Sequence, residues 1–318
     1  MKIHVAGKIG TWRTAMSLPL AERIGPAPAS LVEYITLDNI RGGYPERPKA
    51  AALDADFLAD VKAAVAELPA KLWAVFDKRL VGLFFVNDLG GTGFTEYVFD
   101  ANGRPVAAYV VFDAKVLSQK TANAWATWKE NTPFKPDPFY KLHARIESDS
   151  DDNRKNAIQY ILLHELGHVF SVSKQIHPPW NVEPKDVKKQ EVYPFFDLSW
   201  KLDRPKNQYT TRLEKTFPQR RNTVYYFGPK LGAFDMVPTY QNLQQTNFPS
   251  LYAATHPGDD FAESFASYVH VVMMKRPWEI ELQVGEEVMR TVGSCWGEVR
   301  CAKKQEVLER LLRDAGAL

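Results

Sequence analysis

The sequence predicts an α+β fold, with a small mixed β-sheet, then a long apolar helix, then a mostly helical C-terminal part. Three observations lead to this prediction. Apolar residues recur at helical spacing after residue 53, strand-like runs fill residues 80–117, and helical spacing returns at about residues 153–174 and from residue 259 onward. The chain has 318 residues, of which 45% are hydrophobic and 25% charged, as in a globular protein large enough to bury a core.

No linker convincingly divides the chain, so we expect one domain over residues 1–318. Residues 1–50 are rich in Gly and Pro and weakly periodic, which indicates an extended lead-in with a short strand near "LVEYITL" at 31–37. Residues 178–258 are rich in Pro, Tyr, Phe and Trp and show no clean periodicity. We interpret them as a long irregular insertion with a few short elements.

The first regular helix is expected within residues 53–80. Its apolar side chains recur at helical spacing at Phe57, Leu58, Val61, Val65 and Leu68. Asp54 or Asp56 can cap its start, and Pro69 is expected to end it.

Three strand-like runs follow, "LVGLFFVNDL", "FTEYVFD" and "PVAAYVVFDAKVL". The Asn102-Gly103 pair between the second and third runs is a strong signal for a tight β-hairpin turn. We therefore expect a small sheet that is at least partly antiparallel.

The next helix is expected from about Asn153 to about Lys174, with the polar run at 150–152 as candidate caps. The "HPP" at 177–179 should stop this helix, because proline cannot continue it. Two further helices are expected near the C-terminus, over "DDFAESFASYVHVVMM" and "KKQEVLERLLRDAG".

The apolar helix carries "HELGH" at residues 164–168. Positions four apart on an α-helix share a face, so two imidazoles, from His164 and His168, can bind one Zn²⁺. Glu165 lies one residue round, which suits a general base acting on water beside the metal. Gly167 leaves space beside the second imidazole. A buried, satisfied histidine is the ordinary alternative for one such residue, and the pair flanking a Glu favours the metal site.

A catalytic zinc site normally has three protein ligands. The extended motif HExxHxxGxxH is not present, and His177, at the expected helix end, is one alternative. Glu263 in "HPGDDFAESFASYV" is the better candidate. Asp260 and Glu263 also fit a capping box, in which Glu263 would only bond to the helix start. Asp259 or Asp260 can instead cap the helix or orient a metal-bound histidine.

"HELGH" together with the later "DDFAESFASY" resembles the zincin metallopeptidases whose third ligand is a Glu, the gluzincins. The closest likeness is to the lethal-factor-like group, whose later helix often reads E-x-F-A-E-x-F. The resemblance covers these two segments and implies a zincin-like fold, His164, His168 and Glu263 as Zn²⁺ ligands, and Glu165 as the base.

Enzymes of this kind often carry a Tyr seven positions before the third ligand, where it stabilises the oxyanion. Here His256 occupies that position and Tyr252 lies four residues earlier, so either residue is a candidate donor. The resemblance also implies that the strand before the active helix lies at the sheet edge and pairs with an extended substrate. The segment "PVAAYVVFDAKV" is the candidate for that strand.

These inferences predict a zinc metallopeptidase that acts on peptides or proteins. A catalytically inactive zincin scaffold that binds a partner is the alternative, and hydrolysis of a non-peptide amide is a third reading. The formal net charge of +2 does not suggest a nucleic-acid partner, and no apolar run approaches the roughly 20 residues needed to span a membrane.

The compartment is not determined by the sequence. The N-terminus lacks the continuous apolar region of a signal peptide, so a cytoplasmic location is the default and an exported mature form the alternative. Cys295 and Cys301 match no zinc finger or redox pair. They would form a disulfide in an oxidising compartment and stay as thiols in a reducing one.

Overall fold

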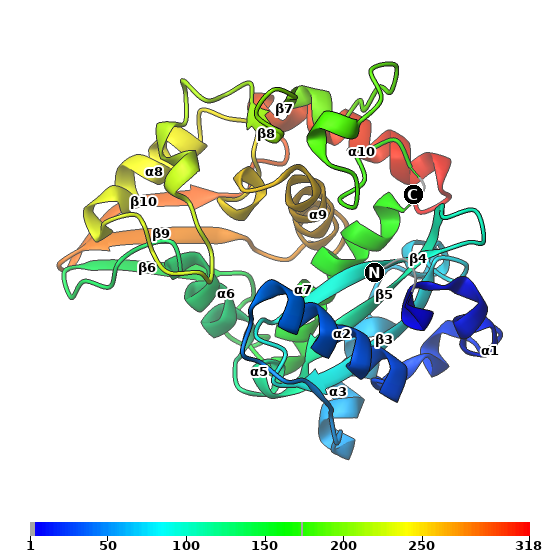
Figure 1. Cartoon of the computed structure of the whole chain (residues 1–318). Helices are drawn as coiled ribbons and strands as arrows, with labels where there is room; N and C mark the ends of the chain where they lie inside the picture. The colour runs from blue at the N-terminus through cyan, green and yellow to red at the C-terminus, as the bar shows by residue number, and fades with distance from the viewer. Residues whose placement is uncertain (1–3, 173) are drawn as a thin grey trace. The chain divides into compact units, whose positions relative to one another are not determined.

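The computed structural model describes residues 4–172 and 174–318 and has a mixed α+β architecture (Figure 1). The chain divides into two compact units. Unit 1 contains Met1–Lys120, Asn153–Ser173 and Ala315–Leu318, and unit 2 contains Thr121–Asp152 and Lys174–Asp314. Each unit is assembled from segments that are far apart in the sequence. One zincin-like domain over residues 1–318 stays a prediction.

Unit 1 is built around a five-stranded mixed sheet of order β1-β3-β5-β4, with β2 paired antiparallel to β3. Strand β3 pairs parallel with β1 and β5, whereas β4 and β5 are antiparallel. The elements of unit 1 are η1 (Val5–Gly7), η2 (Ile9–Trp12), α1 (Arg13–Met16), η3 (Leu20–Glu22), β1 (Ile24–Pro26), α2 (Ala29–Gly42), β2 (Lys49–Ala50), α3 (Ala55–Ala66), α4 (Ala70–Ala74), β3 (Leu80–Asn87), β4 (Gly93–Phe99), β5 (Pro105–Asp113), α5 (Ala114–Ser118) and α7 (Arg154–Ser171).

Three of these strands were expected from the sequence, and the hairpin between β4 and β5 is confirmed. Its turn contains Gly103, whose φ of 72° is a conformation that glycine adopts without steric cost. The expectation that residues 105–116 form the sheet edge is wrong. Strand β5 is bonded to β3 on one side and to β4 on the other, and its continuous apolar run is typical of a central strand. Strand β4 lies at one end of the sheet order and β1 at the other.

The prediction of a short strand at residues 31–37 is also wrong, because these residues form part of helix α2. Leu31, Tyr34 and Ile35 follow the i, i+3, i+4 spacing of one helix face, and all three are buried. Burying each such side chain contributes roughly 1.5–3 kcal/mol. Gly43, with φ 75°, ends the helix in the left-handed conformation.

Helix α3 begins as predicted, with the Asp54 side chain accepting a hydrogen bond from the Phe57 backbone N–H at 2.6 Å. It ends at Ala66, before Pro69, which instead precedes the short helix α4. Proline is tolerated there because the first N–H groups of a helix have no intrahelical acceptor.

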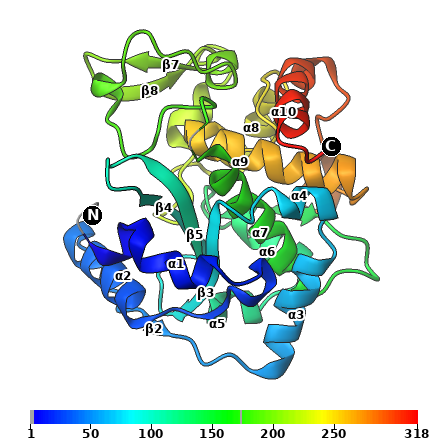
Figure 2. The same cartoon turned by 90° about the vertical axis from the view of Figure 1, so that its right-hand side faces the viewer.

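The two faces of the sheet in unit 1 are covered by different helices. Helix α2 packs on one face, in a core cluster that includes Tyr34, Tyr109 and Val111. Helices α3 and α7 cover the other, where the Phe57 and Phe85 rings meet edge to face at 5.4 Å. Figure 2 shows α2 and α7 on opposite sides of strands β4 and β5. Successive residues of β4 therefore face different helices.

Unit 2 contains two small antiparallel sheets, of order β10-β9-β6 and β7-β8, and Figure 1 shows β9 between β6 and β10. Its elements are α6 (Ala122–Asn131), β6 (Tyr140–Arg145), η4 (Pro184–Asp186), η5 (Phe196–Leu198), β7 (Trp200–Asp203), β8 (Gln208–Thr211), η6 (Pro218–Asn222), η7 (Ala233–Asp235), α8 (Met236–Leu243), η8 (Tyr252–Ala254), α9 (Pro257–Tyr268), the π-helix η9 (Val269–Met273), β9 (Glu279–Val284), β10 (Glu287–Gly293), η10 (Val299–Cys301) and α10 (Ala302–Asp314).

The two C-terminal helices were expected, but a mostly helical C-terminal part is too simple a description. Strands β9 and β10 form a hairpin around Gly285, whose φ is 63°. Residues 178–258 do hold only short elements, as predicted. Aromatic side chains of that segment, such as Trp200 and Phe248, are fully buried, so they build the core of unit 2.

Cys295 and Cys301 form a disulfide in unit 2, with their Cα atoms 5.9 Å apart. The sequence left open whether these cysteines form a disulfide or stay as thiols, and the structure has the disulfide. Among the described residues, no helix combines the length and the apolar character needed to cross a membrane.

Candidate active site

Helix α7 carries the HELGH motif. Its N-cap is Asn153, whose side chain accepts a hydrogen bond from the Asn156 backbone N–H at 3.0 Å, while residues 150–152 lie before it. The helix ends at Ser171, because Val172 is extended with ψ 128°. It therefore stops before the predicted Lys174, and the prolines of the HPP segment are not what ends it.

His164 and His168 lie next to each other on one face of α7. Their ring centroids are 5.0 Å apart and the ring planes are inclined by 80°. Both side chains are only half-buried, whereas Leu166 and Val169 between and beside them are fully buried. Neither imidazole is fully buried in the apolar core. Two imidazoles at this spacing are a suitable pair of nitrogen donors for one Zn²⁺.

Glu165 is nearly buried, at 6% exposure, and is held by the sheet of unit 1. The Thr95 hydroxyl lies 2.7 Å from Glu165 Oε2 and 3.2 Å from the backbone carbonyl oxygen of the same residue. Thr95 belongs to the edge strand β4. Sequence reasoning missed Thr95, because nothing local marks a strand threonine as the partner of a residue 70 positions later.

Helix α9 begins at a histidine cap. His256 Nδ1 accepts a hydrogen bond from the Gly258 backbone N–H at 3.1 Å, and Pro257 occupies the first helical position. The capping box considered as the alternative role of Asp260 and Glu263 does not form, because α9 begins at Pro257 with His256 as its N-cap. With Nδ1 as the acceptor, the ring proton of neutral His256 is on Nε2.

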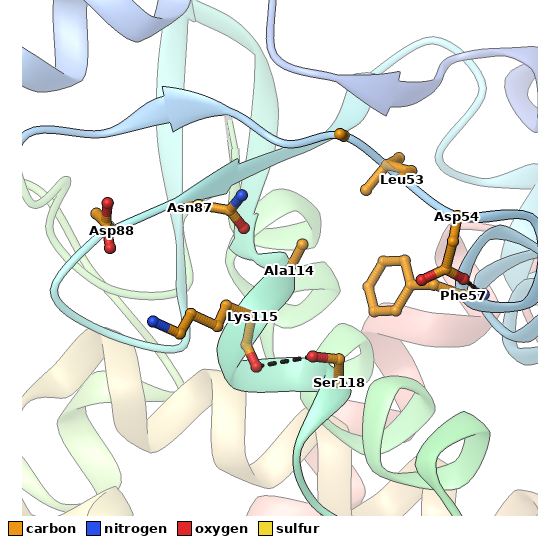
Figure 3. A pocket seen from close by; sticks show the side chains of 9 residues that line it. Leu53, Asp54, Phe57, Asn87, Asp88, Ala114, Lys115 and Ser118 are labelled. Carbon is orange, nitrogen blue, oxygen red and sulfur yellow. Dashed lines mark hydrogen bonds between the residues drawn. The ribbon is translucent and has the colours of Figure 1, made fainter.

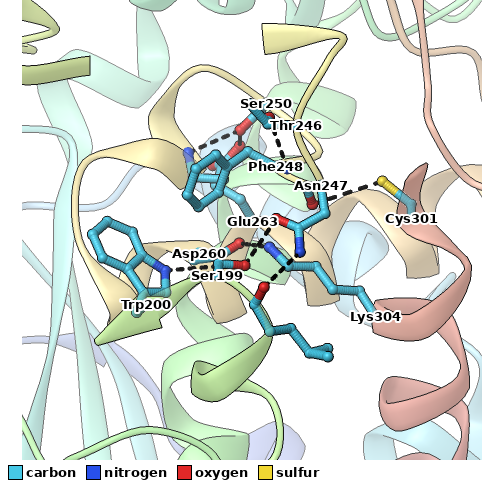
Figure 4. Close-up of polar contacts among 12 residues, drawn as sticks. Ser199, Trp200, Thr246, Asn247, Phe248, Ser250, Asp260, Glu263, Cys301 and Lys304 are labelled. Atoms are coloured by element: carbon cyan, nitrogen blue, oxygen red, sulfur yellow. Dashed lines mark hydrogen bonds and ion pairs between the residues drawn. The ribbon is translucent and has the colours of Figure 1, made fainter. Parts of the chain in front are cut away.

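Two of the three carboxylates on α9 are paired with buried lysines of unit 2, and Figure 4 shows one of these pairs, Asp260 with Lys304. Asp260, with no exposed surface, forms an ion pair with Lys304 and accepts a hydrogen bond from Trp200 Nε1 at 2.9 Å. Glu263, at 1% exposure, has one oxygen 2.9 Å from Lys129 Nζ and accepts a hydrogen bond from Ser250 Oγ at 2.6 Å on the other.

Asp259 differs from its two neighbours on α9. It is half-buried, and its Oδ2 lies 3.4 Å from Thr255 Oγ1, at the long end of the hydrogen-bond range. Each oxygen of the Glu263 carboxylate has a partner inside unit 2. Zinc ligation by Glu263 stays a prediction.

Lys129 lies at the centre of a buried polar cluster in unit 2. Its Nζ contacts Glu263 and lies 4.6 Å from the ring centroid of Tyr252, a cation–π geometry. Glu130, beside it, accepts hydrogen bonds from Tyr225 and Tyr240 at 2.9 and 2.8 Å. Burial raises the pKa of Glu130, while the Lys129 ammonium lowers it. Unit 2 thus brings together two predicted site residues, Glu263 and Tyr252, through Lys129.

The alternative ligand His177 is buried in unit 2, at 3% exposure. Its Nδ1 lies 2.9 Å from the Pro178 carbonyl oxygen, and its ring stacks on Trp180 with centroids 6.3 Å apart. These contacts are those of a histidine packed into a loop.

Unit 1 also contains a cavity of about 340 Å³ between α3, α5 and the end of β3 (Figure 3). Polar groups around it have structural roles. Asp54 caps α3, and the Ser118 hydroxyl donates to the Lys115 carbonyl at 2.9 Å. This cavity does not present the convergent donors that a catalytic site needs.

No protein-family model matches this chain, and neither do the curated proteins or the solved structures with which it was compared. The resemblance to zincins therefore depends on the two motif segments. The function has to be argued from the residues themselves.

Proposed function

We propose that this protein is a zinc-dependent metallopeptidase, with His164 and His168 as metal ligands and Glu165 as general base. One observation carries the proposal. Two adjacent half-buried imidazoles flank a nearly buried carboxylate whose orientation is held by a hydroxyl from the sheet. When bound, zinc would polarise a water molecule and lower its pKa. Glu165 would take the proton from that water during attack on the carbonyl and deliver it to the leaving amine.

The third ligand is proposed to be a carboxylate of α9. Glu263 is the candidate from the sequence, but both its oxygens already have partners. Asp259, one turn earlier and half-buried, is the competitor, and "DDFAESF" places it at the first acidic position of E-x-F-A-E-x-F. Asp260 is excluded by its buried ion pair with Lys304.

Asp259 as ligand would also identify the group that stabilises the oxyanion. Seven positions before Glu263 is His256, whereas seven positions before Asp259 is Tyr252. His256 already uses one ring nitrogen to cap α9. Tyr252 has the phenolic donor expected of such enzymes, and its ring lies against the Lys129 ammonium. We therefore favour the pair of Asp259 and Tyr252 over the pair of Glu263 and His256.

An extended peptide is the substrate class that suits the edge strand. Strand β4 is the last strand of its sheet and is bridged on its outer side by Lys8 at Phe99. The Tyr97 backbone N–H already donates to Glu96 Oε1, so we propose that a peptide adds to β4 near Thr95, the residue of this strand that contacts Glu165. A peptide paired with β4 would therefore lie beside the proposed base.

The function is tested by measuring zinc content and digestion of a peptide library by the purified chain. About one zinc per chain and cleavage that Glu165→Gln abolishes without metal loss are expected. Absence of bound metal at saturating zinc would contradict the proposal and favour the inactive binding protein. Cleavage by the Gln variant at the parent rate would show that Glu165 is not the base.

The same zinc measurement separates the two candidate third ligands. If Asp259 is the ligand, Asp259→Asn should weaken zinc binding strongly, whereas Glu263→Gln should weaken it much less, because the partners of Glu263 are Lys129 and Ser250 and not a proposed ligand. The reverse order would restore Glu263 as the ligand. Asp151→Asn, a change at an acid that precedes α7, is a control that should leave zinc binding unchanged.

A further inference from the structure

We infer that Thr95 is a positioning residue that holds the Glu165 carboxylate in its working orientation. This inference rests on the proposed function, because it assigns a role in the reaction to a contact inside unit 1. The Thr95 hydroxyl has one hydrogen and two oxygens of Glu165 within reach, at 2.7 Å and 3.2 Å. The hydrogen is better donated to the nearer, ionised acceptor, since hydrogen bonds to charged oxygens are shorter and stronger.

The position of that hydroxyl is determined by the sheet. Thr95 pairs with Val110 of the central strand β5, and its branched side chain has few χ1 choices. Its neighbours point to the opposite face, where Phe94 packs in the α2 core cluster and Glu96 accepts a hydrogen bond from Tyr34 at 3.0 Å. With both neighbours held, the Thr95 side chain is directed at α7.

The two carboxylate oxygens of Glu165 differ in their hydrogen bonding. Oε2 accepts the Thr95 hydroxyl, whereas Oε1 has no hydrogen-bond partner among the residues that the structure describes. A glutamate side chain has three rotatable bonds, so an unheld carboxylate would sample several orientations. Holding one oxygen keeps the other in a single place, where it can take a proton from water. The protein thereby reduces the orientational cost of the proton transfer.

A purely structural role is the competing explanation, because the same bond also ties α7 to the edge of the sheet. The two roles predict different kinetics. Loss of a structural tie would lower stability, or weaken substrate and metal binding, and would leave turnover by the folded enzyme unchanged. Loss of a positioning contact would lower kcat and leave KM and zinc content as they are.

The test compares Thr95→Val, Thr95→Ser and Thr92→Val in the full chain with zinc bound, using a peptide that the parent cleaves. Valine keeps the shape and removes the hydroxyl, and serine keeps the hydroxyl. Thr92, just before β4, is the matched control, since its hydroxyl has no hydrogen-bond partner among the described residues. Melting curves establish that each variant is folded, and Thr95→Ala replaces the valine variant if that one misfolds.

We expect Thr95→Val to lower kcat by about 10- to 100-fold at unchanged KM and zinc content, the effect of losing one hydrogen bond to a charged group. Thr95→Ser should recover most of the rate, and Thr92→Val should match the parent. Parent-like kcat in Thr95→Val, or a serine variant as slow as the valine variant, would overturn the inference alone. An inactive parent, or an active Glu165→Gln, would instead overturn the proposed function together with this inference.

Discussion

Helices α7 and α9 both place acidic side chains in apolar surroundings, but the partners of these carboxylates differ between the two helices. On α9, Asp260 and Glu263 are each neutralised by a buried lysine, Lys304 and Lys129. On α7, Glu165 is nearly as buried but has a hydroxyl as its only partner among the described residues. A buried carboxylate with its own cation is engaged in stabilising the fold. Glu165, the proposed general base, is held by a neutral hydroxyl instead.

The largest change in stability that tests this contrast is expected when a lysine of α10 is replaced. Lys304→Met would leave Asp260 buried without its cation, which should cost about 3–5 kcal/mol in the free energy of unfolding. Chemical denaturation measures this cost. The double variant Lys304→Met with Asp260→Asn should recover part of it, since no unpaired charge remains. A loss below about 1 kcal/mol in the single variant would show that the pair is not a structural anchor.

A second test uses the buried His270, just beyond α9, which contrasts with the half-buried histidines of α7. Burial lowers the pKa of His270 from 6.5 to about 4, while hydrogen bonds to the Ile146 and Pro277 carbonyls oppose that shift. The unfolded chain therefore binds a proton that the folded chain does not. Stability should fall as pH decreases from about 6.5 to 4, by roughly 3 kcal/mol from this residue.

The control for that pH dependence is His270→Gln, which cannot titrate and keeps a donor for the carbonyls. Denaturation midpoints of parent and variant should converge as the pH falls through this window. If the parent and the variant lose stability equally between pH 6.5 and 4, the loss originates elsewhere in the chain.

The smallest expected effect is that of Glu165→Gln on stability. Glutamine keeps an oxygen that can accept the Thr95 hydroxyl, so the free energy of unfolding should change by less than about 1 kcal/mol. Turnover should fall by about 10²- to 10⁴-fold, as for loss of a general base. A variant that loses stability as strongly as Lys304→Met would place Glu165 with the structural acids of α9.

Local patterns were reliable where the interactions they report are local. The period of apolar residues located α3, α9 and α10, and Asn102-Gly103 located the hairpin, because both signals concern residues within a few positions of each other. The lead-in at residues 1–50 was misread for the opposite reason. Its Gly and Pro residues masked the helical spacing of Leu31, Tyr34 and Ile35, whose burial depends on a sheet formed later in the chain.

The sequence by itself determined that His164 and His168 share a helix face with Glu165 beside them, because the pitch of an α-helix sets that relation within one turn. Only the tertiary structure decided that β4, and not β5, lies at an edge of the sheet. It also decided which carboxylates of α9 form ion pairs with lysines, and which hydroxyl donates a hydrogen bond to Glu165. These partners lie 134 positions apart for Lys129 and Glu263 and 70 for Thr95 and Glu165. Contacts at such separations are made by the packing of whole elements, and no short pattern encodes them.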